Sequence, residues 1–218
     1  MTTVETSPAD GVWTVLVAAG SGQRFGADKL QAHLDDQRTV LEVALAQAQE
    51  VSEGVVLVVR NDDRAVSAAP PGVKAVAGGD SRSESVRRGL GWVPDTAQVV
   101  LVHDAARPLA DSALYGRVIA AVRSGAVAVV PVIPVVDTIR SLDGSLVARD
   151  QLRAVQTPQG FDPGALRAAH AGGADATDDA SLVEADGGEV VLVDGDVRNL
   201  KITRPVDIDL ARALLHHR

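Results

Sequence analysis

The sequence predicts an α/β protein built on a doubly wound, mostly parallel sheet, and three observations lead to this fold class. Short β-branched apolar runs alternate with helical patterns over more than half of the chain, which is typical of βαβ units. The first apolar run ends in a glycine-rich loop, at the edge where parallel sheets bind ligands. With 218 residues, 46% hydrophobic and 23% charged, the chain fits one globular domain, which we place at residues 11–218.

Five apolar runs are predicted as strands of this sheet because they are rich in valine and bounded by polar or glycine residues. They are Val12–Ala18, Val55–Val59, Val73–Ala77, Val99–His103 and Ala126–Val132. The helices predicted between them are Val40–Gln49, Ser83–Leu90 and Asp111–Val122. Thr39 and Glu42 form a capping box ahead of the first helix. Ser83 and Asp111 are the predicted N-caps of the other two. Strands joined through helices in this way lie parallel, with right-handed crossovers.

The alternation ends after Pro131, where the sequence predicts a hairpin arm. Two short strand-like runs, Val135–Arg140 and Leu146–Ala148, flank an Asp143-Gly144 turn. Because a two-stranded hairpin is marginally stable alone in water, we expect residues 135–155 to pack on a second subunit of a homodimer. Helical patterns then return at Asp162–His170, Asp178–Glu184 and Pro205–Leu215.

The composition argues against several classes of protein. A net charge of −8 and a low aromatic content of 2% do not suit nucleic-acid binding, which needs many cations and stacking side chains. No apolar run approaches the roughly 20 residues of a membrane helix, and the polar, acidic Met1–Asp10 does not resemble a signal peptide. Cysteine is absent, which excludes disulfides and thiolate chemistry. We expect a cytoplasmic protein that binds neither nucleic acid nor membrane.

The segment Val15–Lys29 is the strongest functional signal. Its small residues leave backbone N–H groups uncovered at the end of a buried strand, which makes an anion cradle. The predicted cradle contains the glycines Gly20, Gly22 and Gly26, which follow Ala18 and Ala19 at the end of the strand. Arg24 and Lys29 add two cations beside it, and such a pair fits a polyphosphate better than a single phosphate. The loop therefore predicts a nucleoside triphosphate site.

Two commoner glycine-rich loops do not match this segment. The dinucleotide fingerprint GxGxxG fails because Phe25 stands where the third glycine belongs. The Walker pattern fails because Leu30, not serine or threonine, follows Lys29. A tight turn without a ligand stays open as the simpler alternative.

The segment Val99–Pro108 carries the second signal. Asp104 follows a buried strand at the same sheet edge as the glycine loop, where a carboxylate can hold Mg²⁺ against phosphate oxygens; a local turn cap is the alternative. His103 is expected to be a hydrogen-bonded core residue rather than a base. Arg107, fixed by Pro108, presents a planar fork that fits a phosphate or a carboxylate.

The remaining polar segments carry weaker signals. Gly79, Asp80 and Ser85 lie at a strand–turn–helix junction that could contact a base, although an ordinary junction needs the same residues. Thr138 and Arg149 lie on the arm, where polar residues are common. Thr157–Phe161 and Ala176–Ser181 precede helices, where capping is the default interpretation, and Asn199–Thr203 places Lys201 in a strand-like run.

Taken together, these segments resemble the 2-C-methyl-D-erythritol 4-phosphate cytidylyltransferases of the non-mevalonate isoprenoid pathway. The matching motifs, in family order and at similar spacing, are AAGSGQRFG, GGDSRSESV, VHDAARP, the DT of the arm, TPQGF, TDDAS and NLKITRP. The resemblance extends from Val15 to Asp209 and implies a Rossmann-like nucleotidyltransferase fold. The departures from the family pattern are Val17, Asp28, Leu30 and Arg198.

The resemblance also implies a reaction: CTP and 2-C-methyl-D-erythritol 4-phosphate give the CDP-linked polyol and pyrophosphate. It implies that the triphosphate is held by Arg24, Lys29 and Lys201, with Mg²⁺ near Asp104. The implied nucleotide contacts are Ala18, Ala19, Gly20, Gly22, Gly79, Asp80 and Ser85. The implied contacts to the polyol phosphate are Arg107 and Thr157 and, from the arm of a partner subunit, Thr138 and Arg149.

Three alternatives remain at this point. The acceptor is open within the class, because cytidylyltransferases that act on ribitol 5-phosphate share most of these motifs. An NAD(P)-dependent oxidoreductase is disfavoured by the failed GxGxxG pattern and by the Arg24 and Lys29 pair. A non-catalytic nucleotide-binding protein is disfavoured because the cations that the chemistry needs are all present.

Overall fold

A computed structural model of the protein describes residues 9–20, 28–60, 69–70 and 72–216. Among these residues, eight strands form one sheet in the order β10-β5-β9-β4-β1-β2-β3, with β8 paired to β5. The strands are β1 (Val12–Val17), β2 (Gly54–Val59), β3 (Val73–Ala77), β4 (Val99–Asp104), β5 (Ala128–Pro134), β8 (Arg153–Val155), β9 (Gln159–Phe161) and β10 (Val190–Asp194). The pairs β3–β2, β2–β1, β1–β4 and β5–β10 are parallel. The mostly parallel α/β fold predicted from the sequence is confirmed.

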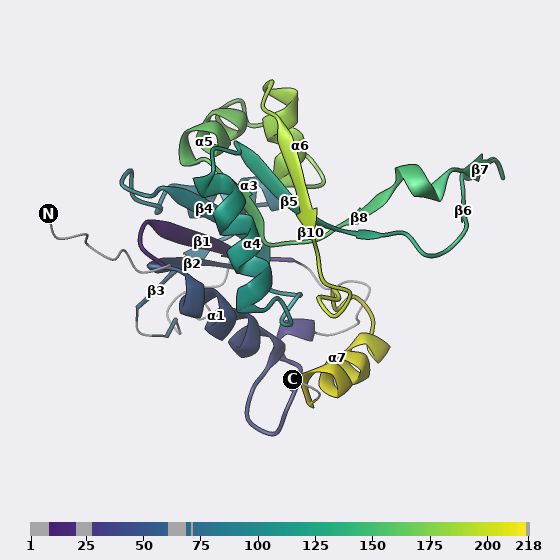
Figure 1. The fold of residues 1–218 in the computed structure, drawn as a ribbon. Helices are drawn as coiled ribbons and strands as arrows, with labels where there is room; N and C mark the ends of the chain where they lie inside the picture. The colour runs from purple at the N-terminus through teal and green to yellow at the C-terminus, as the bar shows by residue number, and fades with distance from the viewer. Residues whose placement is uncertain (1–8, 21–27, 61–68, 71, 217–218) are drawn as a thin grey trace, which may run out of the picture.

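Helices cover both faces of the sheet (Figure 1). They are α1 (Val40–Val51), α3 (Arg82–Leu90), α4 (Ser112–Arg123), α5 (Pro163–Ala171), α6 (Asp179–Ala185) and α7 (Val206–His216), with a short 3-10 turn η1 at Lys29–Gln31. Successive strand residues point to opposite faces, so Leu16 packs in the core cluster of α1 and Val15 in that of α3, α5 and α6. No helix in the described ranges is long and apolar enough to cross a membrane.

The predicted caps are confirmed for two of the three helices between the early strands. Thr39 and Glu42 form the capping box of α1, and the Asp111 side chain accepts from the backbone N–H of Leu114 at the start of α4. The prediction of Ser83 as the N-cap of α3 is wrong, because Ser81 caps this helix. Ser83 instead lies buried against the backbone of Ala176.

The C-terminal half differs most from the prediction, because three of its strands were not predicted. The antiparallel strand β9 lies between β4 and β5 and joins the two parallel parts of the sheet. Its Gly160 is a close-packing position, since a Cβ there would lie 2.4 Å from Val118 Cγ1 of α4. The expectation that Thr157–Phe161 caps a helix is therefore wrong for Gln159–Phe161. The strand predicted around Lys201 is also wrong, because residues 199–203 form no strand.

The predicted arm is present and extends away from the sheet in Figure 1. It leaves the body through β5 and returns through β8, which pair antiparallel at its base. Its outer part holds the two-residue strands β6 (Ile139–Arg140) and β7 (Leu146–Val147) and the 3-10 turn η2 (Arg149–Gln151). The strands are shorter than predicted. Whether the arm packs on a second subunit stays a prediction.

The two glycines inside α3 and α4 offer a matched test of this packing. A Cβ at Gly89 would lie 2.6 Å from Val15 Cγ1, whereas a Cβ at Gly116 would meet no atom within 4 Å. We expect Gly89→Ala to destabilise the protein by about 1–3 kcal/mol through overpacking. Gly116→Ala should instead stabilise it by about 0.5–1 kcal/mol because alanine favours the helix. Urea unfolding of both variants checks this, and a stabilised Gly89→Ala protein would contradict the packing of α3 described here.

Candidate active site

A cleft of about 570 Å³ opens where the parallel strands end. Its walls come from the end of β1, the end of β4, the turn between β3 and α3, and the segment before α7. The lining residues include the predicted Ala18, Ala19, Gly20, Lys29, Gly79, Asp80, Ser85, Asp104 and Lys201. The parallel topology therefore brings together nine predicted site residues from segments that are far apart in the sequence. Predicted residues Gly22 and Arg24 lie outside the described residues.

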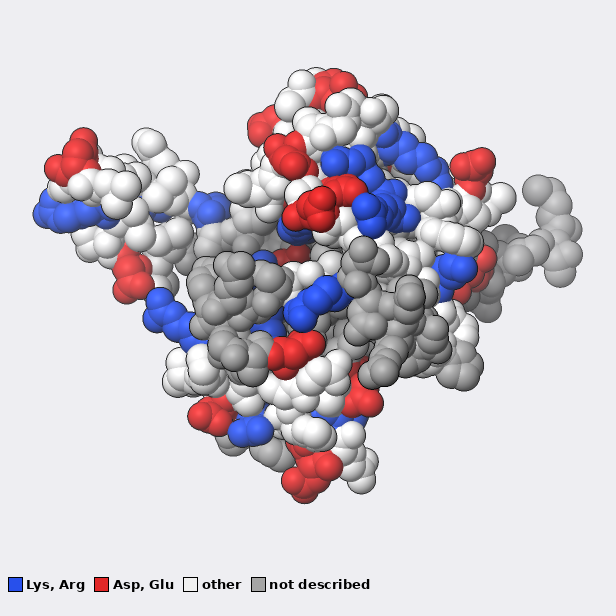
Figure 2. Space-filling model, turned by 180° about the vertical axis from the view of Figure 1, so that it is seen from behind, with Lys and Arg blue, Asp and Glu red and all other residues white. Residues whose placement is uncertain are grey.

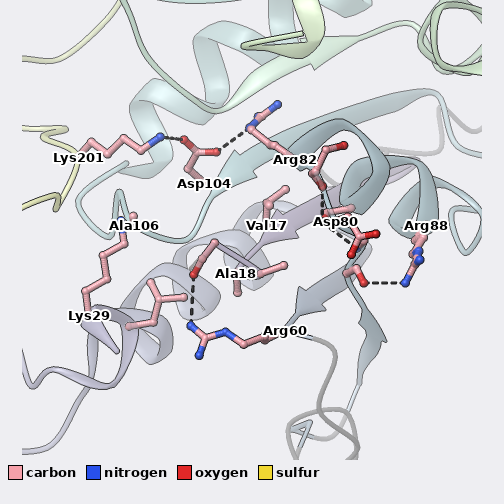
Figure 3. Close-up of a pocket in the computed structure, with 17 residues that line it drawn as sticks. Val17, Ala18, Lys29, Arg60, Asp80, Arg82, Arg88, Asp104, Ala106 and Lys201 are labelled. Atoms are coloured by element: carbon pink, nitrogen blue, oxygen red, sulfur yellow. Dashed lines mark hydrogen bonds and ion pairs between the residues drawn. The ribbon is translucent and has the colours of Figure 1, made fainter. Parts of the chain in front are cut away.

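Asp104 lies between two cations on one side of the cleft (Figure 3). Its Oδ2 lies 2.6 Å from Lys201 Nζ, and its Oδ1 lies 3.3 Å from Arg82 Nε. Burial alone would raise the pKa of this carboxyl, but Arg82 and Lys201 outweigh burial and hold the pKa well below its usual value. Asp104 is therefore a carboxylate at any physiological pH.

Arg82 extends this ion pair into the protein interior. Its Nη1 donates to Oδ2 of Asp179 at 2.7 Å, and Oδ1 of Asp179 lies 3.0 Å from Nε2 of His170. Burial opposes the charge of Arg82, but the two carboxylates dominate and raise its pKa. The sequence reasoning missed Arg82. One signal was available, because an arginine in the first helical turn opposes the helix dipole and so needs carboxylate partners elsewhere.

His103 lies one residue before Asp104 and faces away from the cleft into the core, as expected from the sequence. Its Nδ1 lies 3.0 Å from Thr157 Oγ1, and its Nε2 lies 3.1 Å from the carbonyl oxygen of Arg107. Complete burial lowers the pKa of His103 to about 4. The ring is neutral near pH 7 and fixes the turn that follows β4.

The cations on the other parts of the rim are bonded to backbone carbonyls. Lys29 Nζ donates to the carbonyl of Ile202 at 2.8 Å, next to Lys201 in the chain. Arg60 and Arg88 also line the cleft, and they donate to the carbonyls of Gly20 and Gly78. Arg88 also forms an ion pair with Glu84 at 2.6 Å. Neither arginine was singled out from the sequence, because nothing local distinguishes them from surface arginines.

The turn between β3 and α3 is held by side chains of its own helix. The backbone N–H of Gly79 donates to Ser85 Oγ at 3.1 Å, and that of Asp80 donates to Glu84 at 2.8 Å. A Cβ at Gly79 would lie 2.2 Å from Glu84 Cδ, so a side chain there would displace Glu84 from its bond to Asp80. The predicted base-contact residues therefore form a preorganised part of the wall.

Four predicted acceptor-binding residues do not line this cleft: Arg107, Thr138, Arg149 and Thr157. Arg107 donates to the carbonyls of Asn199 and Val155, and it thereby ties the arm to the segment that carries Lys201. Burial lowers the pKa of Arg107. Arg149 donates to the carbonyl of Val136 within the arm. Their contacts to an acceptor stay predictions.

The donor set at Asp104 fits a divalent ion that arrives with a polyphosphate. Within the described ranges, no group of three acidic or histidine side chains could cage a metal. Mg²⁺, however, commonly takes one or two carboxylates and completes its shell with phosphate oxygens and water. Asp104 supplies one such carboxylate at the cleft.

Charges of both signs are interspersed on one face of the protein. In Figure 2, lysine and arginine side chains lie beside acidic ones over the visible face.

Comparisons with known proteins agree on one family. The model of the 2-C-methyl-D-erythritol 4-phosphate cytidylyltransferase family matches residues 12–217. A protein of that name from Nocardia farcinica is 45% identical, with 96% of each chain covered. One from Rhodococcus opacus is also 45% identical, with 94% of this chain and 95% of that protein covered. The crystal structure of the enzyme of that name from Thermus thermophilus superimposes with a TM-score of 0.78 at 40% identity, covering 93% of this chain and 98% of that one.

His103 generates a pH dependence that can be measured. Its pKa is about 4 in the folded protein against an ordinary 6.5, so between these values the unfolded chain binds the additional proton. The contribution of His103 to the free energy of unfolding is fully present above pH 6.5. It is lost as the pH falls toward 4, by about 3 kcal/mol at most. Urea unfolding from neutral to acidic pH should therefore show a smaller loss for His103→Gln than for the wild type.

The glutamine variant is the appropriate comparison because its amide can replace both ring hydrogen bonds. Asp104 does not interfere with this measurement. Because its pKa in the folded protein is lowered, its contribution to the free energy of unfolding changes with pH only below about the ordinary carboxyl pKa of 3.8. Equal pH dependence in the two proteins would contradict the burial of a neutral His103.

Proposed function

Because the chain belongs to the 2-C-methyl-D-erythritol 4-phosphate cytidylyltransferase family, we propose that its cleft transfers a cytidylyl group from CTP to 2-C-methyl-D-erythritol 4-phosphate. The products are 4-diphosphocytidyl-2-C-methyl-D-erythritol and pyrophosphate. The observation that carries the proposal is the convergence of Lys29, Lys201 and Asp104 on one cleft at the carboxyl edge of the sheet. This edge is where open α/β sheets bind nucleotides.

The reaction is an in-line displacement at the α-phosphorus. An oxygen of the polyol phosphate forms a bond to the α-phosphorus as the bond to the pyrophosphate oxygen breaks. A phosphate monoester has a second pKa of about 6, so the attacking group is already an anion near neutral pH. A general base is therefore unnecessary, which agrees with the buried, neutral His103. The enzyme must bring two anions together and neutralise the charge between them.

Lysines 29 and 201 supply that neutralisation in the proposal. Both ammonium groups lie at the cleft, and Lys29 contacts the residue next to Lys201 in the chain. Two cations that line one cleft can contact different phosphates of one triphosphate. Arg24 would add a third charge from the glycine-rich loop, which lies outside the described residues.

The base and ribose fit the wall formed by the turn after β3. Gly79, Asp80 and Ser85 line the cleft there, together with Ala18 and Ala19 at the end of β1. Backbone groups and hydroxyls can distinguish cytosine by hydrogen bonding without aromatic stacking. Gly20, and Gly22 beyond the described part, would offer N–H groups to the phosphates.

A divalent ion, Mg²⁺ by preference, belongs to this proposal. It would be held by Asp104 together with phosphate oxygens, and it would neutralise charge on the triphosphate. The buried carboxylate stays ionised because of its neighbouring cations, which keeps it available as a ligand.

The acceptor site is proposed to include the arm of a second subunit. Arg107 and Thr157 would hold the polyol phosphate from one chain, and Thr138 and Arg149 from the other. The arm supports this arrangement because it bears exposed apolar side chains that a partner would cover. These are Val136, Leu142 and Leu146. The functional unit is then a homodimer.

The reaction is tested by measuring pyrophosphate release with purified protein. The four ribonucleoside triphosphates are combined with 2-C-methyl-D-erythritol 4-phosphate and with ribitol 5-phosphate, in Mg²⁺ or in excess EDTA. We expect CTP with the methylerythritol phosphate to exceed every other pair by at least about 10-fold in kcat/KM. A preference for ribitol 5-phosphate would identify the alternative acceptor. Full activity in EDTA would contradict the proposed requirement for a divalent ion but not the reaction itself.

The shared site is tested with a hybrid dimer. Lys29→Ala and Arg149→Ala homodimers should each lose about 10²-fold in kcat, because each lacks one electrostatic contact. In a hybrid of the two chains, one site has both mutations and the other has neither, provided that Arg149 acts across the interface. Tagged hybrids should therefore recover about half of the wild-type activity per dimer.

The matched control is a hybrid of two differently tagged Lys29→Ala chains, which should recover nothing. An inactive Lys29→Ala/Arg149→Ala hybrid, or an active monomer at the assay concentration, would overturn the shared site while leaving the reaction itself intact.

A further inference from the structure

The two oxygens of Asp104 have different partners, and this difference carries a mechanistic inference. Lys201 contacts Oδ2 and Arg82 contacts Oδ1. Lys201 lies on a segment without helix or strand, and its side chain is 39% exposed. Arg82 lies at the start of α3, and its side chain is 23% exposed. One oxygen thus contacts an accessible cation and the other a more buried one.

Arg82 is held where it is by a second buried carboxylate. Asp179 is fully buried and contacts Arg82 Nη1 at 2.7 Å through Oδ2. Its Oδ1 contacts the buried His170 at 3.0 Å. An arginine that bridges two carboxylates through separate nitrogens is fixed in position as well as in charge. Arg82 cannot move to a phosphate without leaving Asp179 unpaired in the interior, which is strongly unfavourable.

Lys201 faces the opposite situation. In the proposed function it contacts the phosphates of the nucleotide, and we expect its contact with Asp104 to loosen as its ammonium turns toward them. If Lys201 were the sole counter-ion from the protein, its departure would leave the buried carboxylate without a cation until the proposed divalent ion had bound, which carries the same penalty. With Arg82 on Oδ1, the carboxylate keeps a charge partner throughout, and Oδ2 can change partners.

We propose that Arg82 is a positioning residue: it is the permanent counter-ion of Asp104 that allows Lys201 to transfer from Asp104 to the nucleotide phosphates. Asp179, supported by His170, holds Arg82 in this role. This inference rests on the proposed function, because it requires Lys201 to contact the substrate. It adds three residues, Arg82, Asp179 and His170, to the machinery of that reaction.

The competing arrangement is that Arg82 binds a phosphate directly, since it also lines the cleft. The geometry favours the positioning role, because Nε and Nη1 both contact carboxylates. The two arrangements predict different energetic coupling between Arg82 and Lys201. A direct contact would act independently of Lys201, whereas a positioning residue acts through it.

A double-mutant cycle on kcat for cytidylyl transfer separates them. We expect Lys201→Met to lower kcat by about 10²–10³-fold, as for the loss of a transition-state contact. Arg82→Gln should lower kcat by about 10–100-fold, as for a residue that orients another. The double variant should be no more than about 3-fold slower than Lys201→Met alone. Fully additive losses would overturn the proposal in favour of a direct contact.

Asp179→Asn tests the same role from outside the cleft, because Asp179 does not line it. We expect kcat to fall about 10-fold while KM for CTP stays within about 3-fold. Arg82→Lys should be intermediate, since one ammonium cannot bridge two carboxylates in the same way. Arg87→Gln is the matched control: this arginine lies on the same helix, bonds the carbonyl of Ala174, and should leave kcat unchanged.

Thermal unfolding of every variant distinguishes a loss of catalysis from a loss of folded protein. If Arg82→Gln and Asp179→Asn unfold earlier but show wild-type kcat per folded enzyme, the proposal is wrong. Should Arg82→Gln not fold, Arg82→Lys and Asp179→Asn decide the question by the same criterion. Wild-type kcat in Lys201→Met would instead contradict the assignment of Lys201 in the proposed function, which is a distinguishable result.

Discussion

The ion pair of Asp104 with Lys201 and Arg82 is the interaction on which the arrangement of the site depends. It joins the end of β4, the start of α3 and the segment before α7, and Asp104 and Lys201 are separated by 97 residues in sequence. Through Asp179 and His170 it also reaches α6 and α5. Burial makes each carboxylate costly without a partner, so the cations and the elements that carry them must assemble together. The same contacts that close the fold thereby place the charges of the cleft.

Local sequence signals explain why the first half of the fold was predictable. Valine-rich runs, the Thr39–Glu42 capping box and the Asp111 cap are contained within a few residues, and the structure has each where the pattern placed it. The C-terminal half relies on long-range contacts. Strand β9 has three residues and lies between the longer strands β4 and β5. Its Gln159 is buried with its side-chain amide donating to Asp178. A three-residue segment has too little periodicity to indicate a strand.

The site residues likewise divide into those that local sequence patterns predict and those that depend on long-range contacts. Lys29, Asp104 and the glycines were predictable because strand ends in a parallel sheet meet at one edge. Arg82 was not, because its importance comes from two carboxylates 22 and 97 residues away. Lys201 was identified through the family motif, while its segment was assigned wrongly as a strand. Its backbone is instead fixed by side chains: Gln156 bonds the carbonyl of Asn199, and Arg107 bonds the same oxygen.

An acidic protein that binds a triphosphate must keep positive charge available at one place. With a net charge of −8, freely mobile cations would find carboxylates elsewhere on the surface. The rim of the cleft instead orients Arg60 and Lys29 through backbone carbonyls, which accept a hydrogen bond without carrying a formal charge. Carboxylates contact the other cations of the cleft: Asp104 contacts Lys201 and Arg82, Asp179 contacts Arg82, and Glu84 contacts Arg88. Hydrogen bonds to carbonyls and ion pairs with carboxylates thus both hold cations in position at the cleft, and only the carbonyls do so without offsetting the positive charge.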